Sequence, residues 1–352
     1  MMNTNIMKKI FSKKSYLVII IGLILVVMPA ISQDQFLIST FVYTFLFAAF
    51  GVAWNLIGGY GAQISWCHAA FVACGAYTSF LAQDYLGLSP FLTMPVGMLI
   101  SFLLATLIGS GTFKLRGSFF SLSTIAFAEI VKIILLYFRD FTGGASGKWI
   151  VYEGSNLLKM TFQNDIPFYY IAFIVMAIIL ISTALFEKSK TGYYLSMIKG
   201  DEDAASSLGI ETFKIKLRAF QLSAIFASCI GTIYAYFLSY IDPYAICSMD
   251  LSVRIGMMAI VGGLGTLWGP VLGAFLLVPL TQLSSALLGN VSGASMLLYG
   301  VVLVLVVLFK PEGIITIFTH GGGTSILTKM NAMIKALFKK VKKPLDKPGE
   351  SR

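Results

Sequence analysis

The chain has 352 residues, of which 57% are hydrophobic and only 12% are charged. A soluble protein of this length carries about 25% charged residues, so this composition excludes an ordinary soluble protein and predicts one embedded in a membrane. The net charge of +10 would favour nucleic-acid binding only if the basic residues were gathered in a soluble domain, and they are spread along the chain instead.

Ten apolar runs can span a bilayer, whose hydrocarbon core of about 30 Å requires about 20 residues of helix. The runs lack the alternating pattern of a membrane barrel strand, which predicts helices. The predicted fold class is therefore all-α, a polytopic transmembrane bundle of about ten helices, of which the eighth is the shortest. In chain order the runs cover residues 16–32, 37–57, 62–82, 91–113, 117–138, 167–186, 217–240, 250–263, 268–289 and 293–309.

The positions of Lys and Arg predict the orientation of this bundle. If the N-terminus is cytoplasmic, 21 of the 26 basic residues lie in cytoplasmic connections and tails, so both termini are predicted to be cytoplasmic. The chain then divides into a basic N-terminus (1–15), a transmembrane domain (16–313) and a basic tail (314–352). The 21 residues are four lysines before residue 15, Lys114, Arg116, six between Lys188 and Arg218, and nine from Lys310 onward.

Both terminal segments allow two interpretations. The first run ends in Pro29-Ala30-Ile31-Ser32, a weak match to a signal-peptidase site, and is otherwise an uncleaved first helix. Between residues 326 and 343, apolar residues recur at helical spacing among six lysines. This pattern predicts an amphipathic helix on anionic membrane lipid, with a basic helix bound by a partner protein as the alternative.

Glycine-rich and polar positions are candidates for a substrate path. The glycine clusters at 58–61 and 262–265 permit broken helices whose freed backbone groups can face a substrate, and tight helix packing is the alternative explanation. The loop at 142–147 either lines a polar path or is a flexible connection. The candidate path residues are Gly59, Gln63, Ser65, Glu129, Gly143, Gly144, Gly262 and Gly263.

Glu129 lies within an apolar run, where a charge is costly and therefore a candidate functional group. Lys132 lies one helical turn away on the same face, so a local ion pair is one interpretation. A polar wall of the substrate path and a proton-carrying site are the others. His68 is predicted to be a hydrogen-bonded packing residue rather than a proton relay.

The sequence lacks the motifs of an enzyme. It contains no HExxH helix, no GxSxG elbow and no P-loop, so the chain is predicted to have no ATPase site of its own. Four cysteines without a CxxC pair and two isolated histidines, His68 and His320, exclude a zinc scaffold and a disulfide framework. We therefore expect no bound metal or cofactor.

The segment 188–216 is too polar to cross the membrane, yet apolar residues recur in it at helical spacing. A short helix that presents small and apolar side chains suits a groove of another protein, and a solvated loop with one helical turn is the alternative. The candidate contact residues are Gly192, Glu202, Asp203, Ala204, Ala205, Leu208 and Gly209.

These contact residues resemble the cytoplasmic coupling loop of bacterial ABC-importer permeases, whose signature is Glu-Ala-Ala, three variable residues and Gly. Asp203 takes the acidic position of that signature. Stretches Asn55–Tyr77, Leu115–Gly147 and Val261–Ala274 resemble the branched-chain amino acid permeases of the LivM type. Four motifs in the right order identify the chain as a member of that family, from about residue 40 to 313.

Four positions depart from the family pattern. Trp66-Cys67 stands where the family usually has Leu-Gly, and Tyr193 and Lys199 stand where it usually has Arg. The bulky Trp66 would alter helix packing or narrow the path. These departures bear most on the identity of the substrate.

The resemblance implies a membrane-spanning permease subunit of a bacterial ABC importer for branched-chain amino acids, located in the inner membrane. It implies three kinds of partner: a second, LivH-like permease, two cytoplasmic ABC ATPase subunits that use the ATP, and an extracytoplasmic solute-binding protein. A permease for urea or short amides is the alternative within the family. A proton-coupled secondary transporter, with Glu129 as the carrier, is the alternative from another class.

Overall fold

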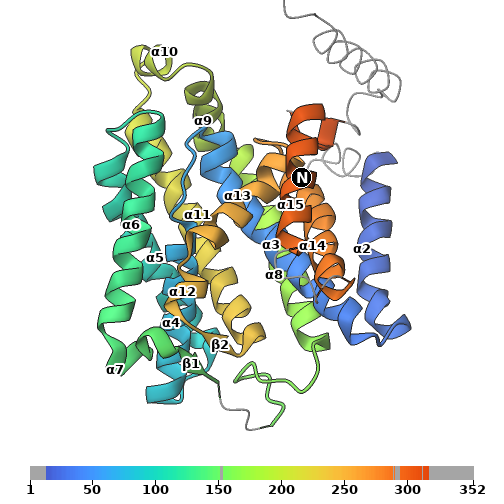
Figure 1. Cartoon of the computed structure of the whole chain (residues 1–352). Coiled ribbons are helices and arrows are strands. Elements are labelled where there is room, and N and C mark those ends of the chain that lie inside the picture. Colours follow the sequence, from blue (N-terminus) through green and yellow to red (C-terminus); the bar gives the residue numbers. More distant parts are fainter. Residues whose placement is uncertain (1–12, 151–153, 288, 290–293, 311, 317–352) are drawn as a thin grey trace, which may run out of the picture.

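The structure is a computed structural model, and the description covers residues 13–150, 154–287, 289, 294–310 and 312–316 (Figure 1). These residues form a bundle of long helices with short elements at both ends. In chain order the elements are α2 (Lys13–Ile31), α3 (Gln35–Asn55), η1 (Leu56–Tyr60), α4 (His68–Leu86), α5 (Pro90–Thr112), α6 (Ser118–Tyr137), α7 (Arg139–Thr142), η2 (Gly144–Ser146), β1 (Lys148–Trp149), α8 (Ile166–Glu187), α9 (Lys190–Gly200), α10 (Glu202–Ser207), α11 (Thr212–Leu238), β2 (Tyr240–Ile241), α12 (Pro243–Ile246), α13 (Met249–Gly262), α14 (Gly269–Leu287) and α15 (Ala294–Phe309).

A helix lies at each of the ten predicted ranges. Within the described residues, seven of them are long and apolar enough to cross a membrane: α3 with η1, α5, α6, α8, α11, α12 with α13, and α14. The predicted all-α polytopic bundle is therefore confirmed. The described residues of the remaining three, α2, α4 and α15, are too few or too weakly apolar to meet this condition. The total of ten crossings therefore stays a prediction.

The centre of the bundle is formed by α3, α4 and α11. Small residues let α4 and α11 approach closely, which is how helices commonly pack in membranes. A Cβ atom added to Gly75 would lie 2.0 Å from the carbonyl oxygen of Ser228, and one added to Gly231 would lie 2.5 Å from that of Val72. Backbones in contact at this range leave no room for any larger residue, so α4 and α11 pack as one unit.

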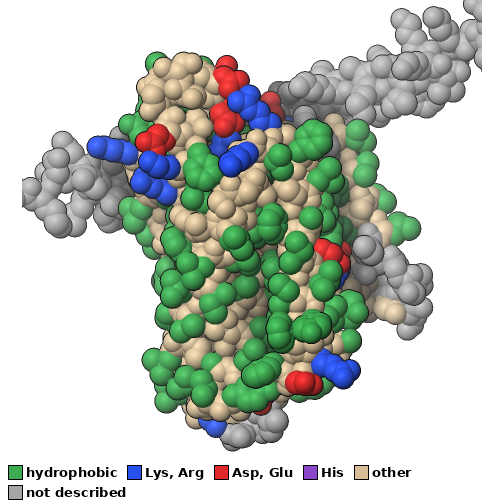
Figure 2. Space-filling model, turned by 90° about the vertical axis from the view of Figure 1, so that its left-hand side faces the viewer, with side chains coloured by type: hydrophobic (Ala, Val, Ile, Leu, Met, Phe, Trp, Pro, Cys, Tyr) green, Lys and Arg blue, Asp and Glu red, His purple; other side chains and the backbone are tan. Residues whose placement is uncertain are grey.

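The peripheral helices α5, α6 and α8 expose large apolar side chains such as Leu103, Phe119 and Ile181. Figure 2 shows one such face, where hydrophobic side chains cover the middle and most of the charged ones gather at one end. Lipid is as apolar as these side chains, so a chain in a bilayer has no reason to bury them. The surface therefore fits a membrane-embedded protein.

Two sets of connections lie at opposite ends of the bundle (Figure 1). One end carries α9 and α10. The other carries α7 and a two-stranded antiparallel sheet, in which Lys148 pairs with Ile241 and Trp149 with Tyr240. The described part of the loop after α6 thus contains a helical turn and a strand.

Candidate functional site

The chain between α3 and α4 breaks the helical pattern inside the bundle. After the π-helical turn η1, residues 61–67 have no helical structure, and Ala62 has a φ of +52°. The predicted start of the third helix at residue 62 was therefore wrong, because α4 begins at His68. Trp54 explains part of the break, because its Nε1 donates a hydrogen bond of 2.7 Å to the carbonyl of Ser65. In a continuous helix that carbonyl would accept from a backbone amide, and here the Trp54 side chain takes the place of the amide.

This extended segment also packs against α6. The Trp66 amide donates to Thr124 Oγ1 at 3.1 Å, and Ser121 Oγ donates to the Ile64 carbonyl at 2.7 Å. Non-helical backbone at membrane depth is tolerated where it has such partners or lines a cavity. Gln63, a candidate path residue in the segment, is half-buried, whereas the candidate Ser65 is fully buried.

The two glycine clusters, far apart in sequence, meet in space through Asn55. Its side-chain amide donates to the carbonyl of Thr266 at 2.9 Å and accepts from the amide of Gly265 at 2.9 Å. Gly59 lies directly against this contact, since an added Cβ would be 1.8 Å from Asn55 Oδ1. Sequence reasoning missed Asn55, whose signal is an amide side chain at the end of an apolar run.

The second cluster also forms the tight crossing of α13 and α14. A Cβ added to Gly262 would lie 1.7 Å from the carbonyl oxygen of Gly269, and Gly263 has a φ of +135°, which favours glycine. One added to Gly265 would lie 2.5 Å from Lys199 Nζ of α9. The glycine clusters therefore form a packed joint beside the short helix α9.

The structure does not bring the candidate path residues to one place. Gly59, Gly262 and Gly263 are buried in the joint near α9. Gly143 and Gly144 lie at the opposite end, beside the two-stranded sheet, both with positive φ.

Glu129 lies on the surface of the chain. Its carboxylate forms an ion pair with Lys132 on the same helix, but 51% of the Glu129 side chain is exposed, against 18% for Lys132. The predicted local ion pair is thus present, with its acidic member on the surface of this chain. His68, by contrast, is fully buried with its Nε2 2.7 Å from Ser223 Oγ, so the prediction of a hydrogen-bonded packing residue is confirmed.

The polar segment after α8 forms two short helices, each with an N-terminal cap. Ser189 Oγ accepts from the Gly192 amide at 3.2 Å at the start of α9. Asp201 Oδ1 accepts from the amides of Asp203 and Ala204, at 2.9 and 3.0 Å, at the start of α10. Such caps stop one helix and begin the next. The predicted helical segment is present, in place of a loop with a single turn.

Two ion pairs tie α10 to the bundle. Lys216 Nζ of α11 lies 2.6 Å from Glu202, and only 3% of the Lys216 side chain is exposed. Arg116, in the turn before α6, binds Asp203 with two hydrogen bonds of 2.7 and 3.1 Å. These hydrogen bonds and the positive charge of Arg116 hold the pKa of the Asp203 carboxyl below its usual value. Glu202 and Asp203 therefore both bind partners within the chain.

Two small residues of the segment also serve internal packing. Ala205 is only 2% exposed, so the expectation that it presents its side chain to another protein was wrong. The apolar spacing that predicted a contact face here marks the side of α10 that packs inward. Gly192 is needed against α8, because an added Cβ would lie 2.3 Å from the Phe186 carbonyl oxygen. Gly209 has open space around it and a φ of +82°.

An exposed groove runs between α9 and the α10–α11 turn, with a volume of about 540 Å³. Leu208 is 71% exposed and Tyr193 64% exposed, and both line it. Arg218 and Lys214 lie at its rim. Exposed apolar side chains beside charged ones, outside the apolar belt, are typical of a protein contact surface.

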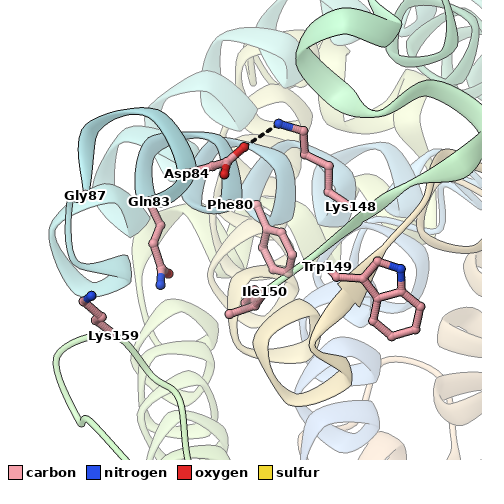
Figure 3. A pocket seen from close by; sticks show the side chains of 8 residues that line it. All are labelled: Phe80, Gln83, Asp84, Gly87, Lys148, Trp149, Ile150 and Lys159. Atoms are coloured by element: carbon pink, nitrogen blue, oxygen red, sulfur yellow. Dashed lines mark hydrogen bonds and ion pairs between the residues drawn. The ribbon is translucent and has the colours of Figure 1, made fainter. Parts of the chain in front are cut away.

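A smaller pocket lies at the opposite end, between the end of α4 and strand β1 (Figure 3). Asp84 and Lys148 point toward each other there, with their charged atoms 2.5 Å apart, and Phe80 and Ile150 lie beside them. Lys148 also lies 4.5 Å from the ring centre of Tyr85. The pocket measures about 180 Å³, which is less than the roughly 300 Å³ of a typical small-molecule site.

Comparisons with known proteins place these features in context. The family model described as branched-chain amino acid transport system, permease component, matches residues 36–307. The chain is 27% identical over 296 residues to the high-affinity branched-chain amino acid transport system permease protein LivM of Escherichia coli K12, covering 77% of this chain and 68% of that protein. It is 23% identical to LivH of Salmonella typhimurium, covering 76% and 91%. The autoinducer 2 import system permease protein LsrC of Yersinia enterocolitica is 25% identical and covers 54% of each chain. No solved structure matches the chain.

Proposed function

The chain belongs to the family of branched-chain amino acid transport system permease components, and on that premise we propose that it is one permease subunit of a bacterial ABC importer for branched-chain amino acids. The observation that carries the proposal is the capped helical pair α9–α10, held at one end of an apolar bundle by ion pairs from α10 to α11 and to the turn before α6. A permease that has no ATPase site of its own needs such a rigid surface to receive motion from a separate ATPase subunit.

The proposed topology has ten crossings, with α9, α10 and both termini in the cytoplasm of a bacterial inner membrane. The separation of α9–α10 from the β1–β2 sheet by the length of the bundle supports it (Figure 1). The bundle corresponds to the proposed permease domain, residues 16–313. Residues 1–12 and most of the basic tail, 317–352, lie outside the described residues, so the predicted lipid-binding helix of the tail stays a prediction.

The proposed ATPase contact is the groove between α9 and the α10–α11 turn. Of the candidate contact residues, Leu208 and Gly209 line this groove, and both are exposed. Glu202, Asp203, Ala205 and Gly192 act indirectly, by holding the two helices in place, and Ala204 is exposed beside the groove.

Motion of α10 would reach the membrane by two routes. The Asp203–Arg116 pair leads to the start of α6, and the Glu202–Lys216 pair leads to α11. The joint formed by Gly59, Gly262 and Gly263 beside α9 offers a third contact with the bundle. Rigid-body rocking of helices driven in this way is a standard means of alternating access.

The proposed path for the solute lies between this chain and a second, LivH-like permease. The exposed position of Glu129 supports this arrangement, because a carboxylate in the middle of α6 is costly against lipid but acceptable against a polar path. Gln63 and Ser65 belong to the neighbouring extended segment, and Gly143 and Gly144 lie at the extracytoplasmic end. An extracytoplasmic solute-binding protein would deliver the solute there, and two cytoplasmic ABC ATPases would supply the energy.

Reconstitution of the complete importer in liposomes tests the proposal. Uptake of radiolabelled leucine should require ATP on the ATPase side and the solute-binding protein, and should persist after the proton gradient is collapsed. Uptake without any ATPase, abolished by an uncoupler, would establish the secondary-transporter alternative. Uptake of urea but not of leucine, isoleucine or valine would establish the amide-permease alternative.

A further inference from the structure

A second cavity, of about 410 Å³, lies between α3, α11, α13, α14 and α15, apart from the residues considered so far. Asp250 and Arg254 of α13 and Gln282 of α14 line it together with apolar side chains such as Phe47 and Met258. Cavities of about 300 to 1,000 Å³ with mixed walls of this kind are the usual form of small-molecule sites.

The charged pair lies at the middle of a membrane crossing. Asp250 and Arg254 are the eighth and twelfth residues of the 20-residue span Pro243–Gly262. Arg254 Nε lies 2.8 Å from Asp250 Oδ2, and each side chain is about half exposed, at 50% and 51%. Half-exposed charges at this depth do not face hydrocarbon, so the cavity must be filled with water, ligand or protein.

Both charged groups have capacity for a further partner. A guanidinium has five N–H donors and a carboxylate accepts about four hydrogen bonds, whereas this pair is joined by a single short contact. A ligand can therefore bind to both groups without separating them. An added carboxylate would bind the free edge of Arg254, and an added ammonium would bind the free oxygen of Asp250.

A tyrosine hydroxyl in the same cavity lacks a partner. The hydroxyl of Tyr299 is buried and makes no hydrogen bond within the described residues. Tyr299 lines the cavity together with Asp250 and Arg254. Buried polar groups are nearly always hydrogen-bonded, so a small shift of the Tyr299 side chain toward a molecule in the cavity would give this enclosed hydroxyl a partner.

We propose that this cavity binds a zwitterionic amino acid with an apolar side chain, as a solute site within this subunit that is separate from the proposed path beside Glu129. Arg254 binds the carboxylate, Asp250 binds the ammonium, and Phe47 and Met258 contact the side chain. The inference rests on the proposed importer function and narrows the substrate class, because urea and short amides offer neither charge to this pair.

Binding of tritiated leucine to the assembled permease–ATPase complex in lipid nanodiscs, without the solute-binding protein, tests the site. Leucine should bind, and norleucine should compete. Leucinol, which lacks the carboxylate, and 4-methylvalerate, which lacks the ammonium, should compete at least about tenfold more weakly, since hydrogen bonds to charged groups are worth about one to two orders of magnitude in affinity.

Single substitutions assign each contact. In Arg254→Gln the affinity for leucine should fall about tenfold or more, and the preference for leucine over leucinol should disappear. In Asp250→Asn the preference for leucine over 4-methylvalerate should disappear.

Tyr299→Phe removes only the unpartnered hydroxyl, so the protein should fold normally and bind leucine several-fold more weakly. Tyr77→Phe is the matched control, because the Tyr77 hydroxyl is also buried without a hydrogen bond but does not line the cavity.

The outcomes separate the site from the importer function. If the complete importer takes up leucine with ATP while Arg254→Gln and Tyr299→Phe bind and transport leucine like the wild type, the proposed function holds and the cavity is not the site. The same conclusion follows if leucine uptake is normal but leucinol competes as well as leucine for binding to the wild-type complex. If the complete importer takes up no branched-chain amino acid, the proposed function fails first.

Discussion

Replacing Glu202 by Gln should destabilise the protein far more than replacing its partner Lys216 by Met. The two residues form one ion pair, but their surroundings differ: 3% of the Lys216 side chain is exposed, against 27% for Glu202. Without the carboxylate, the Lys216 ammonium would remain buried and uncompensated. Breaking a buried pair in this way typically costs about 3 to 5 kcal/mol.

Removing the lysine leaves a different state. The carboxylate of Glu202 can be hydrated where it is exposed, and Met fills most of the volume of the Lys216 stem. We expect Lys216→Met to cost about 1 to 2 kcal/mol. The double variant should be more stable than Glu202→Gln alone, because it leaves no unpaired charge beside the buried position 216.

Unfolding of the four proteins in mixed micelles by increasing SDS, followed by near-ultraviolet circular dichroism, measures these free energies as a double-mutant cycle. A coupling energy below about 0.5 kcal/mol, or a Glu202→Gln variant no less stable than Lys216→Met, would show that the pair does not hold α10 to α11.

The remaining predictions concern three other sites. Arg116→Ala should leave abundance unchanged but lower the uptake per ATP hydrolysed. Because the pKa of Asp203 is lowered in the folded protein, the intact pair should persist above the ordinary pKa of 3.8 and weaken only as the pH falls below that value. The salt dependence of the labelling of a cysteine placed in α10, measured at each pH, would show this. Gly59→Ala should reduce the yield of folded protein, whereas Gly111→Ala, with open space around its Cβ, should not, as size-exclusion profiles in detergent would report. Leu208→Glu should leave the permease folded and abolish co-purification of the ATPase, and recovery of the ATPase in normal amount would contradict the groove assignment.

The sequence was sufficient to locate the helices, because length and apolar character alone determine where a chain can cross a bilayer. Each of the ten predicted ranges contains a helix. The family prediction from four motifs is confirmed by the match over residues 36–307. The helices in the segment 188–216 were also predicted, because apolar residues recur there at helical spacing despite the polar composition.

Long-range contacts could not be read from the sequence. Asn55 and Gly265 are hydrogen-bonded although 210 residues separate them. The burial of Ala205 reversed the expectation that it contacts another protein, because a helical period shows that two faces differ but not which neighbour each one meets. The glycine cluster at 58–61 indicated a break, but not that the next helix begins only at His68, because the residues of 61–67 are compatible with a helix as well.

The close packing of α4 on α11 has a consequence for how the chain is made. α4 is not among the seven helices apolar enough to cross by themselves, and the helix whose backbone it contacts begins at Thr212, after α4 has ended at Leu86. At a synthesis rate of about 5 to 20 residues per second, roughly 6 to 25 seconds pass before α11 emerges. During that interval α4 has to be retained by the insertion machinery, by α3 or by α5, whose Gly97 packs against Gly75, so its packing is completed only after more than half of the protein has been translated.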